Sequence, residues 1–173
     1  PTGSLDRGAR VLDVGSGAGL PGIPLRIAFP AVRLTLLDST AKKTAFLQHM
    51  VKVLGLDSVD IRTGRAEDLG HHSDVRERFD IVLSRAVAKL SVLAELCLPF
   101  CRPGGLTIAH KSAGVDEEIR GANKAIRVMG GRLKEVVEVG GGAPEGVLVV
   151  LEKTAPTPQK YPRRPGIPAK RPL

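Results

Sequence analysis

The stretch 13-DVGSGAGLPGIPL-25 decides the fold, because it places a glycine-rich loop directly behind a short apolar run. Residues 10–14 are expected to form a strand, and a helix should begin near Pro21 and end by Phe29, before Pro30. Side chains are missing where the backbone turns sharply, and the absent Cβ atoms leave room for a ligand at contact distance. The three alternating glycines are Gly15, Gly17 and Gly19. The loop therefore indicates a nucleotide-like ligand bound against the backbone.

The rest of the chain alternates strand-like and helix-like segments. Such alternation predicts an α/β fold with a doubly wound, mainly parallel sheet, helices on both faces, and ligands at the carboxyl ends of the strands. Further strands are expected at residues 32–38, 59–62, 79–84 and 106–111, and helices at residues 40–54, 89–100 and 115–129, with a turn at 102–105. The last two strands, residues 133–139 and 146–152, should pair as an antiparallel hairpin around a glycine-rich loop at 140–146.

Composition and length fit one cytoplasmic domain. The 173 residues are 42% hydrophobic but only 3% aromatic, so the core must consist mainly of Val, Leu, Ile and Ala. No apolar run reaches the roughly 18 residues of a membrane span, and no signal peptide is recognised. Cys97 and Cys101 lack further Cys or His ligands nearby, so we expect structural thiols and no metal site. In the helix at 40–54 the expected apolar face holds Phe46, Met50, Val53 and Leu54, opposite Lys42, Lys43, Gln48 and Lys52.

Acidic residues around the loop discriminate between a dinucleotide and S-adenosylmethionine. Asp38 ends the second strand, where a carboxylate can accept both ribose hydroxyl protons of either ligand. Asp13, just before the first glycine, suits a cationic ammonium group and sits poorly beside a pyrophosphate. S-adenosylmethionine carries such an ammonium and no phosphate. Glu67 and Asp68 follow the third strand, where an adenine amino group could find an acceptor, and the whole set favours S-adenosylmethionine as the cofactor.

Five segments together resemble the RsmG family, also called GidB, of 16S ribosomal RNA guanine-N7 methyltransferases. They are 11-VLDVGSGAGLPGIPL-25, 36-LLDS-39, 64-GRAEDL-69, 83-LSRAVA-88 and 160-KYPRRPGIPAKRPL-173. The resemblance spans nearly the whole chain, and its PGIPL and SRA motifs are not general methyltransferase features. It implies a class I S-adenosylmethionine-dependent methyltransferase fold, which is Rossmann-like, with seven strands and a C-terminal antiparallel hairpin.

The resemblance also implies particular site residues. Gly15 and Leu20 would contact the cofactor at the loop, and Ala66 and Glu67 would contact its adenosine end. Arg85 would stand where cofactor and substrate meet. The family has a helical region before the first strand, whereas only about nine residues precede it here, so the chain resembles a fragment or a shortened member without the RNA contacts of that region.

The implied reaction needs no catalytic base. Guanine N7 has a free lone pair at neutral pH, so it can attack the sulfonium methyl group without first losing a proton. The missing Ser-His-Asp set or acid–base pair is therefore expected, and no residue is assigned a catalytic role with certainty. Arg85 is a candidate anchor for a phosphate, the cofactor carboxylate or guanine O6, and His110 and Lys111 at the end of the fifth strand face the same rim.

The chain divides into a methyltransferase domain, residues 1–153, and a Pro-rich basic tail, residues 154–173. No acid occurs after position 152, so the tail contributes most of the net charge of +8. Its prolines predict an extended segment without a helix, partly polyproline II. The tail is either solvated and disordered or lies along an RNA phosphate backbone, with Tyr161 offering a stacking surface. The residues expected to contact RNA are Lys111, Lys160, Arg163, Arg164, Lys170 and Arg171.

The expected partner is 16S ribosomal RNA or the small ribosomal subunit, with the protein acting as a monomer. Because guanine N7 lies in the deep major groove of A-form RNA, the target should sit in a loop, a bulge or an opened structure. Three alternatives stay open. The same cofactor chemistry could act on a small molecule or a protein, the chain could be an NAD-dependent oxidoreductase, or it could bind RNA and a nucleoside without turnover.

Overall fold

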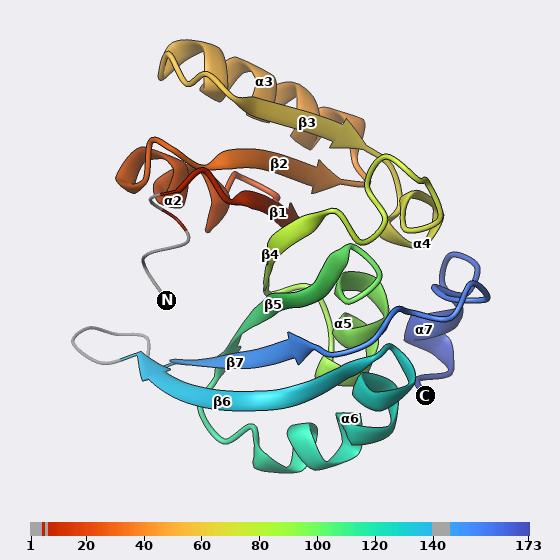
Figure 1. Ribbon diagram of the computed structural model, residues 1–173. Coiled ribbons are helices and arrows are strands. Elements are labelled where there is room, and N and C mark those ends of the chain that lie inside the picture. Colours follow the sequence, from red (N-terminus) through yellow and green to blue (C-terminus); the bar gives the residue numbers. More distant parts are fainter. Residues whose placement is uncertain (1–4, 6, 140–145) are drawn as a thin grey trace.

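The computed structural model describes residues 5, 7–139 and 146–173. A seven-stranded sheet with strand order β3-β2-β1-β4-β5-β7-β6 runs through the molecule (Figure 1). Its strands are β1 (Arg10–Val14), β2 (Arg33–Asp38), β3 (Val59–Thr63), β4 (Phe79–Arg85), β5 (Cys101–Ser112), β6 (Gly131–Val139) and β7 (Gly146–Lys153). The helices are α2 (Gly22–Ala28), α3 (Ala41–Val53), α4 (Ala66–Leu69), α5 (Leu90–Cys97), α6 (Asp116–Val128) and α7 (Ile167–Lys170).

The strand pairing confirms the predicted doubly wound sheet. Strands β3, β2, β1, β4 and β5 are parallel, whereas β7 runs antiparallel between β5 and β6. The chain winds outward from β1 to β3 and then returns to β4, so the strand order reverses between β1 and β4. The glycine loop follows β1 at this switch point, where open α/β sheets bind ligands. The predicted hairpin forms from β6 and β7, and its loop at 140–145 lies outside the described residues.

Two apolar cores lie on the two faces of the sheet. Helices α2 and α3 cover one face, and α5 and α6 cover the other (Figure 1). Successive residues of β1 point to opposite faces, so Val11 joins the α2–α3 core whereas Leu12 and Val14 join the α5–α6 core. Both layers are mainly aliphatic, as the low aromatic content predicted, and the α5–α6 core also holds the buried Phe79 and Phe100.

The predicted apolar face of α3 was correct only at Met50, which packs against the α2–α3 core, and wrong at its other three residues. The helix buries Thr44 and Leu47, whereas Phe46, Val53 and Leu54 are 45%, 63% and 42% exposed. The period was correct, but the buried stripe is rotated by about one residue and is narrow, because α3 packs near the end of the sheet beside β3. Leu47 closes over the core that Ile23 of α2 also enters.

The turn predicted at residues 102–105 is part of a longer strand. Strand β5 begins at Cys101, opposite Phe79, and the ladder shifts register before it resumes at Leu106 opposite Ile81. The helix expected to reach residue 100 ends at Cys97. Both cysteines are buried and unbonded to each other, and burial raises the pKa of the Cys97 thiol to about 12 and that of Cys101 to about 11.

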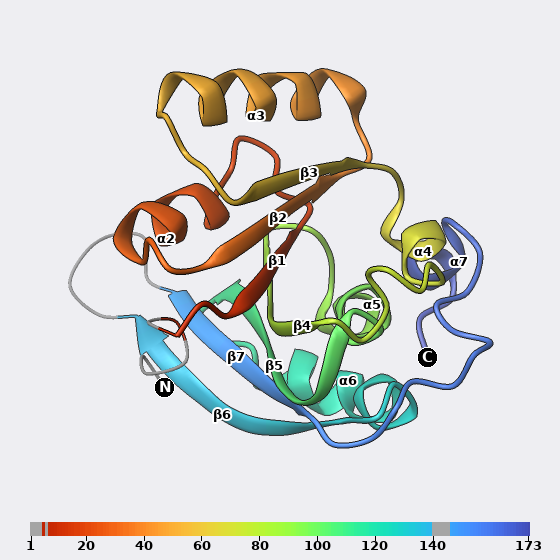
Figure 2. The ribbon, with the colours of Figure 1, turned by 45° about the horizontal axis from the view of Figure 1, so that its top comes forward.

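The C-terminal segment, residues 154–173, packs against the domain rather than extending from it. The prediction of a tail without a helix is wrong, because Ile167–Lys170 forms the one-turn helix α7. Proline lacks only a backbone donor that the first turn does not use, so Pro168 is tolerated there. Pro162 and Pro168 are buried, and Tyr161 packs against the α5–α6 core. In Figure 2 this segment lies beside α4 and α5. Among the described residues, no helix is long and apolar enough to cross a membrane.

Candidate functional site

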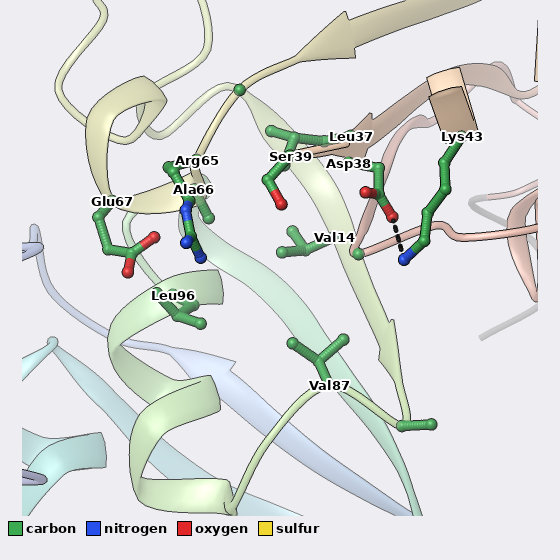
Figure 3. A pocket seen from close by; sticks show the side chains of 13 residues that line it. Val14, Leu37, Asp38, Ser39, Lys43, Arg65, Ala66, Glu67, Val87 and Leu96 are labelled. Carbon is green, nitrogen blue, oxygen red and sulfur yellow. Dashed lines mark ion pairs between the residues drawn. The ribbon is translucent and has the colours of Figure 1, made fainter. Parts of the chain in front are cut away.

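A pocket of about 260 Å³ opens at the carboxyl ends of β1, β2 and β4, where the fold predicts ligand binding. Figure 3 shows its side chains converging from the ends of these strands and from α3, α4 and α5. The lining consists of Val14, Gly15, Leu37, Asp38, Ser39, Lys43, Gly64, Arg65, Ala66, Glu67, Ala86, Val87 and Leu96.

The glycine loop forms one wall, and its tight conformation explains the missing side chains. Gly15 has a φ of +75°, and a Cβ atom there would lie 2.6 Å from Cγ2 of Val87. Gly15 and Ser16 donate their backbone N–H groups to the Leu37 carbonyl at 2.8 and 3.0 Å. The N–H of Gly17 donates to Oδ2 of Asp38 at 3.0 Å. The prediction that the loop exposes its N–H groups is therefore wrong for these residues, because the protein itself accepts their hydrogen bonds.

Internal use of these donors bears on the choice of ligand. A pyrophosphate bound at such a loop needs free N–H groups at the start of the following helix. At the start of α2 the N–H of Gly22 donates to Oδ2 of Asp13 at 3.0 Å, and that of Ile23 donates to the Gly19 carbonyl at 2.7 Å. The loop can therefore bind a ligand through van der Waals contact with its backbone, but it does not offer these N–H groups to a phosphate. This arrangement fits a nucleoside without phosphate groups.

Asp13 is fully buried beneath the loop and does not line the pocket. Its Oδ1 has no hydrogen-bond partner among the residues that the structure describes. Burial, only partly offset by the Gly22 N–H and reinforced by the nearby Asp38, raises the pKa of this carboxyl to about 6. A buried carboxyl with one free oxygen is suited to a cationic partner, because a cation would stabilise its charged form.

Asp38 lies at the end of β2 and faces the pocket, as predicted (Figure 3). Its Oδ1 accepts the Thr40 N–H at 2.9 Å, and Lys43 Nζ lies 3.5 Å from Oδ2. Burial opposes ionisation, but the N–H donors of Thr40 and Gly17 and the Lys43 charge outweigh it, so the pKa of Asp38 lies below its usual value. Asp38 is therefore an ionised acceptor, suited to ribose hydroxyl groups.

The opposite wall comes from α4 and α5. Ala66 and Glu67 are buried at the start of α4 and line the pocket, as the resemblance implied, while Asp68 is exposed outside it. Oε1 of Glu67 accepts the backbone N–H of Gly166 from the C-terminal segment at 3.0 Å. Leu96 of α5 completes this wall (Figure 3).

A second hollow of about 290 Å³ adjoins the pocket at the ends of β4 and β5. Its lining is Arg85, Ala86, His110, Lys111 and Ser112, and Ala86 lines both spaces. Ala86 has a φ of +54°, a left-handed conformation that is uncommon outside glycine and that clusters at functional sites. Exposed Arg85 thus stands beside the predicted cofactor pocket without lining it.

Several predicted residues lie elsewhere or are already paired. Leu20 is 46% exposed and, like Gly17, lies outside the pocket lining. Lys111 forms an ion pair with Glu118 at 2.7 Å and donates to the Ala88 carbonyl at 3.0 Å.

The predicted RNA contacts of the C-terminal segment divide into two groups. Arg163 forms an ion pair with buried Glu95 at 2.6 Å, and Lys160 lies 5.4 Å from the Tyr161 ring centre. Lys160 is exposed as well, as are the other three, Arg164, Lys170 and Arg171.

Sequence reasoning missed some of the lining. Ser39, Lys43, Arg65, Val87 and Leu96 were not predicted. Val87 lies inside the quoted segment 83-LSRAVA-88, and Ser39 directly follows Asp38, so both were within reach of the motifs. No local pattern distinguished Leu96 from its apolar neighbours in α5.

The comparisons with known proteins agree on one family and one fold. A sequence model of the family GidB, described as rRNA small subunit methyltransferase G, matches residues 3–147. The chain is 46% identical to the ribosomal RNA small subunit methyltransferase G of Brevibacillus brevis, over 98% of this chain and 72% of that protein. It is 50% identical to the protein of the same name from Dehalococcoides mccartyi, over 95% of this chain and 71% of the other.

Solved structures resemble the chain in fold alone. The S-adenosylmethionine-dependent methyltransferase SibL in its apo form aligns with a TM-score of 0.65 at 19% identity, covering 88% of this chain and 52% of SibL. TrmN from Thermus thermophilus aligns with a TM-score of 0.64 at 21% identity, covering 84% of this chain and 44% of TrmN.

Proposed function

Because the chain belongs to the GidB family, rRNA small subunit methyltransferase G, we propose that it methylates 16S ribosomal RNA at guanine N7 with S-adenosylmethionine as the methyl donor. The family and the fold make it an S-adenosylmethionine-dependent rRNA methyltransferase. The choice of the N7 atom and the roles of individual residues are our proposals. We also propose that it acts as a monomer in the cytoplasm, where its ribosomal substrate is found.

One observation carries the cofactor assignment. The tight glycine loop has no free N–H groups for a phosphate at the positions described above, and the carboxyl groups of Asp13 and Asp38 lie next to it. The loop donors are satisfied internally, and Asp38 presents an ionised acceptor to the pocket. We assign Asp38 to the ribose hydroxyls and the wall of Ala66 and Glu67 to the adenine end. Asp13 lies buried beneath the loop outside the lining, and we propose that its charge attracts the cofactor's ammonium group without direct contact. S-adenosylmethionine would supply an activated methyl group on a sulfonium.

The chemistry requires orientation more than proton transfer. Guanine N7 attacks with its lone pair, so the protein has no proton to remove before the methyl group moves. Holding the two reacting atoms in line is worth on the order of 7–11 kcal/mol when the geometry is good. The second hollow adjoins the pocket through Ala86, so a base placed there would lie beside the cofactor. Arg85 is exposed at this junction and is suited to anchor a phosphate or guanine O6.

Labelled methyl transfer tests the proposal. The unaltered chain is incubated with labelled S-adenosylmethionine and either 16S RNA or assembled small subunits, and the nucleosides are then identified by mass spectrometry. We expect 7-methylguanosine. The variant Arg85→Ala should lose most of this activity while it retains affinity for S-adenosylhomocysteine. Methylation at another atom would refute the N7 assignment, and preference for NADH over S-adenosylhomocysteine in competition calorimetry would refute the cofactor.

A further inference from the structure

Helix α4 carries two lining residues of the pocket but has little intrinsic stability. It spans only the four residues Ala66–Leu69 and has no side-chain hydrogen bond at its N-terminal cap. A single helical turn is unstable in water, because the nucleation cost exceeds what so few backbone hydrogen bonds return. The position of this wall must therefore come from tertiary contacts.

The C-terminal segment supplies those contacts from behind the wall. The N–H of Gly166 donates to Oε1 of Glu67 at 3.0 Å, and Nε2 of His71 lies 2.7 Å from the Pro162 carbonyl oxygen. A Cβ atom on Gly70, which ends α4, would lie 2.9 Å from Pro162, so helix and segment are in close contact. These contacts come from the turn that precedes α7, and in Figure 2 the C-terminal segment passes close to α4.

Arg76 joins the end of α4 to the same segment. Its Nη1 donates to the carbonyls of Gly70 at 2.7 Å and Tyr161 at 2.9 Å. Its Nη2 donates to the Thr157 carbonyl at 2.8 Å. One guanidinium thus fixes the distance between α4 and the segment, and its planar fork of donors makes that geometry specific.

The second helix of the wall, α5, is held by Arg163. The backbone N–H of Arg163 donates to Oε1 of Glu95 at 2.8 Å, and its Nη2 donates to Oε2 at 2.6 Å. The Glu95 side chain is 1% exposed, so the pair is largely withdrawn from water. Leu96, the next residue of α5, lines the pocket.

We propose that the C-terminal segment is a structural part of the S-adenosylmethionine pocket, with Arg163 and Gly166 as positioning residues. They act through Glu95 and Glu67 and do not touch the cofactor. This inference rests on the proposed function of the pocket and extends it. It also changes the role of Arg163, because a guanidinium bound twice to a buried carboxylate is not available to an RNA phosphate.

Calorimetric titration with S-adenosylhomocysteine tests the proposal in the full chain. We compare Arg163→Gln with Arg164→Gln, a neighbouring exposed cation. We expect Arg163→Gln to weaken binding at least tenfold with a stoichiometry near one, and Arg164→Gln to bind like the unaltered chain. A purely structural loss would instead lower the stoichiometry and leave the dissociation constant unchanged. The conservative Arg163→Lys, which retains the charge, should recover part of the affinity.

Kinetics give an independent readout. The Arg163→Gln variant should show a raised KM for S-adenosylmethionine, with kcat at saturation and the KM for RNA little changed. Wild-type affinity and KM in this variant would overturn the inference.

A second variant decides if Arg163→Gln does not fold, since it leaves a buried carboxylate unpaired. Arg76→Gln removes the donors that join the end of α4 to the segment but leaves the Arg163–Glu95 ion pair, and Arg78→Gln, a neighbouring exposed arginine, is its control. Weaker binding by Arg76→Gln alone supports the proposal, and binding like that of the unaltered chain in both variants overturns it. Failure of the unaltered chain to bind S-adenosylhomocysteine would refute the proposed function itself, so the two failures are distinct.

Discussion

The two walls of the pocket are held in place by contacts of different range. The glycine-loop wall, residues 13–43, is built by chain neighbours, and its Gly17 and Asp38 lie 21 residues apart. The helical wall, formed by α4 and α5 with the C-terminal segment, depends on Glu95–Arg163 and Glu67–Gly166 contacts that span 68 and 99 residues. Motifs close together in the sequence therefore predict much of the first wall, whereas the partners that hold the second lie too far apart in the sequence for a local pattern to pair them.

The largest effect should come from a methyl group placed inside the glycine-loop wall. In Gly15→Ala the new Cβ would collide with Val87 at a backbone angle of +75°. The left-handed backbone costs a non-glycine residue about 1–3 kcal/mol of stability. The collision must also displace Gly15 or Val87, which both line the pocket, so affinity for S-adenosylhomocysteine should fall about 100-fold. Titration calorimetry measures the loss.

Gly114→Ala is the matched control for this substitution. Gly114 has a φ of +80°, but a Cβ there would meet no atom within 4 Å. It should lower the melting temperature through the same backbone cost and leave the affinity unchanged. Equal affinity losses in both variants would show that the loop acts through general stability and not through its shape.

A smaller loss is expected from Asp38→Asn in the same wall. The amide keeps one acceptor but loses the charge that the loop N–H groups and Lys43 stabilise. A hydrogen bond to a charged group is worth about 1.5–3 kcal/mol, so affinity for S-adenosylhomocysteine should fall roughly 10- to 100-fold. Asp68→Asn, an exposed acid next to the helical wall, is the control and should bind normally. A loss in Asp68→Asn would reassign the adenine acceptor to that residue.

The same contrast explains what the sequence could predict. The sheet and its hairpin follow from local patterns and were confirmed, and Gly15 of the loop and Asp38 line the pocket. The burial of the C-terminal segment and the ion pair of Arg163 could not be predicted in this way. The sequence around Arg163 contains no pattern that indicates its partner, the buried Glu95 of α5. The prediction of the buried face of α3 was mostly wrong for a related reason. The helical period determines the spacing of apolar residues, but the neighbouring layer determines which of them are buried.

The buried carboxyl of Asp13 gives the glycine-loop wall a pH dependence. Its pKa of about 6 lies above the unfolded value of 3.8, so the folded protein binds more protons between these limits, and this carboxyl makes it less stable as pH rises from about 4 to about 6. We propose that the cofactor's ammonium, bound nearby, favours the ionised form through its charge. Affinity should therefore rise about tenfold between pH 5 and pH 7.

Asp13→Asn tests this origin of the pH dependence. The amide can still accept the Gly22 N–H but cannot ionise, so both the stability slope and the affinity slope across this window should flatten. Calorimetry and thermal unfolding at matched pH values measure the two slopes. An unchanged affinity slope in Asp13→Asn would assign the titration to another group.

The smallest effect concerns the outer face of the C-terminal segment, whose inner face supports the helical wall. Arg164, Lys170 and Arg171 are exposed. Each phosphate contact to single-stranded RNA contributes about 0.7 to the slope of log affinity against log salt. Replacing all three with Gln should reduce that slope by about 2. The matched control removes three exposed cations of α6, namely Arg120, Lys124 and Arg127.

Because the outer cations and the inner contacts belong to one short segment, the two measurements separate its roles. The outer triple variant should bind S-adenosylhomocysteine normally in the absence of RNA, whereas Arg163→Gln should keep the RNA salt slope and lose cofactor affinity. If the slope of log RNA affinity against log salt is unchanged in the triple variant, these three cations do not contact RNA, and the segment only supports the cofactor pocket. A triple variant that also loses cofactor affinity would mean that the outer charges help to dock the segment, since nothing else connects them to the pocket.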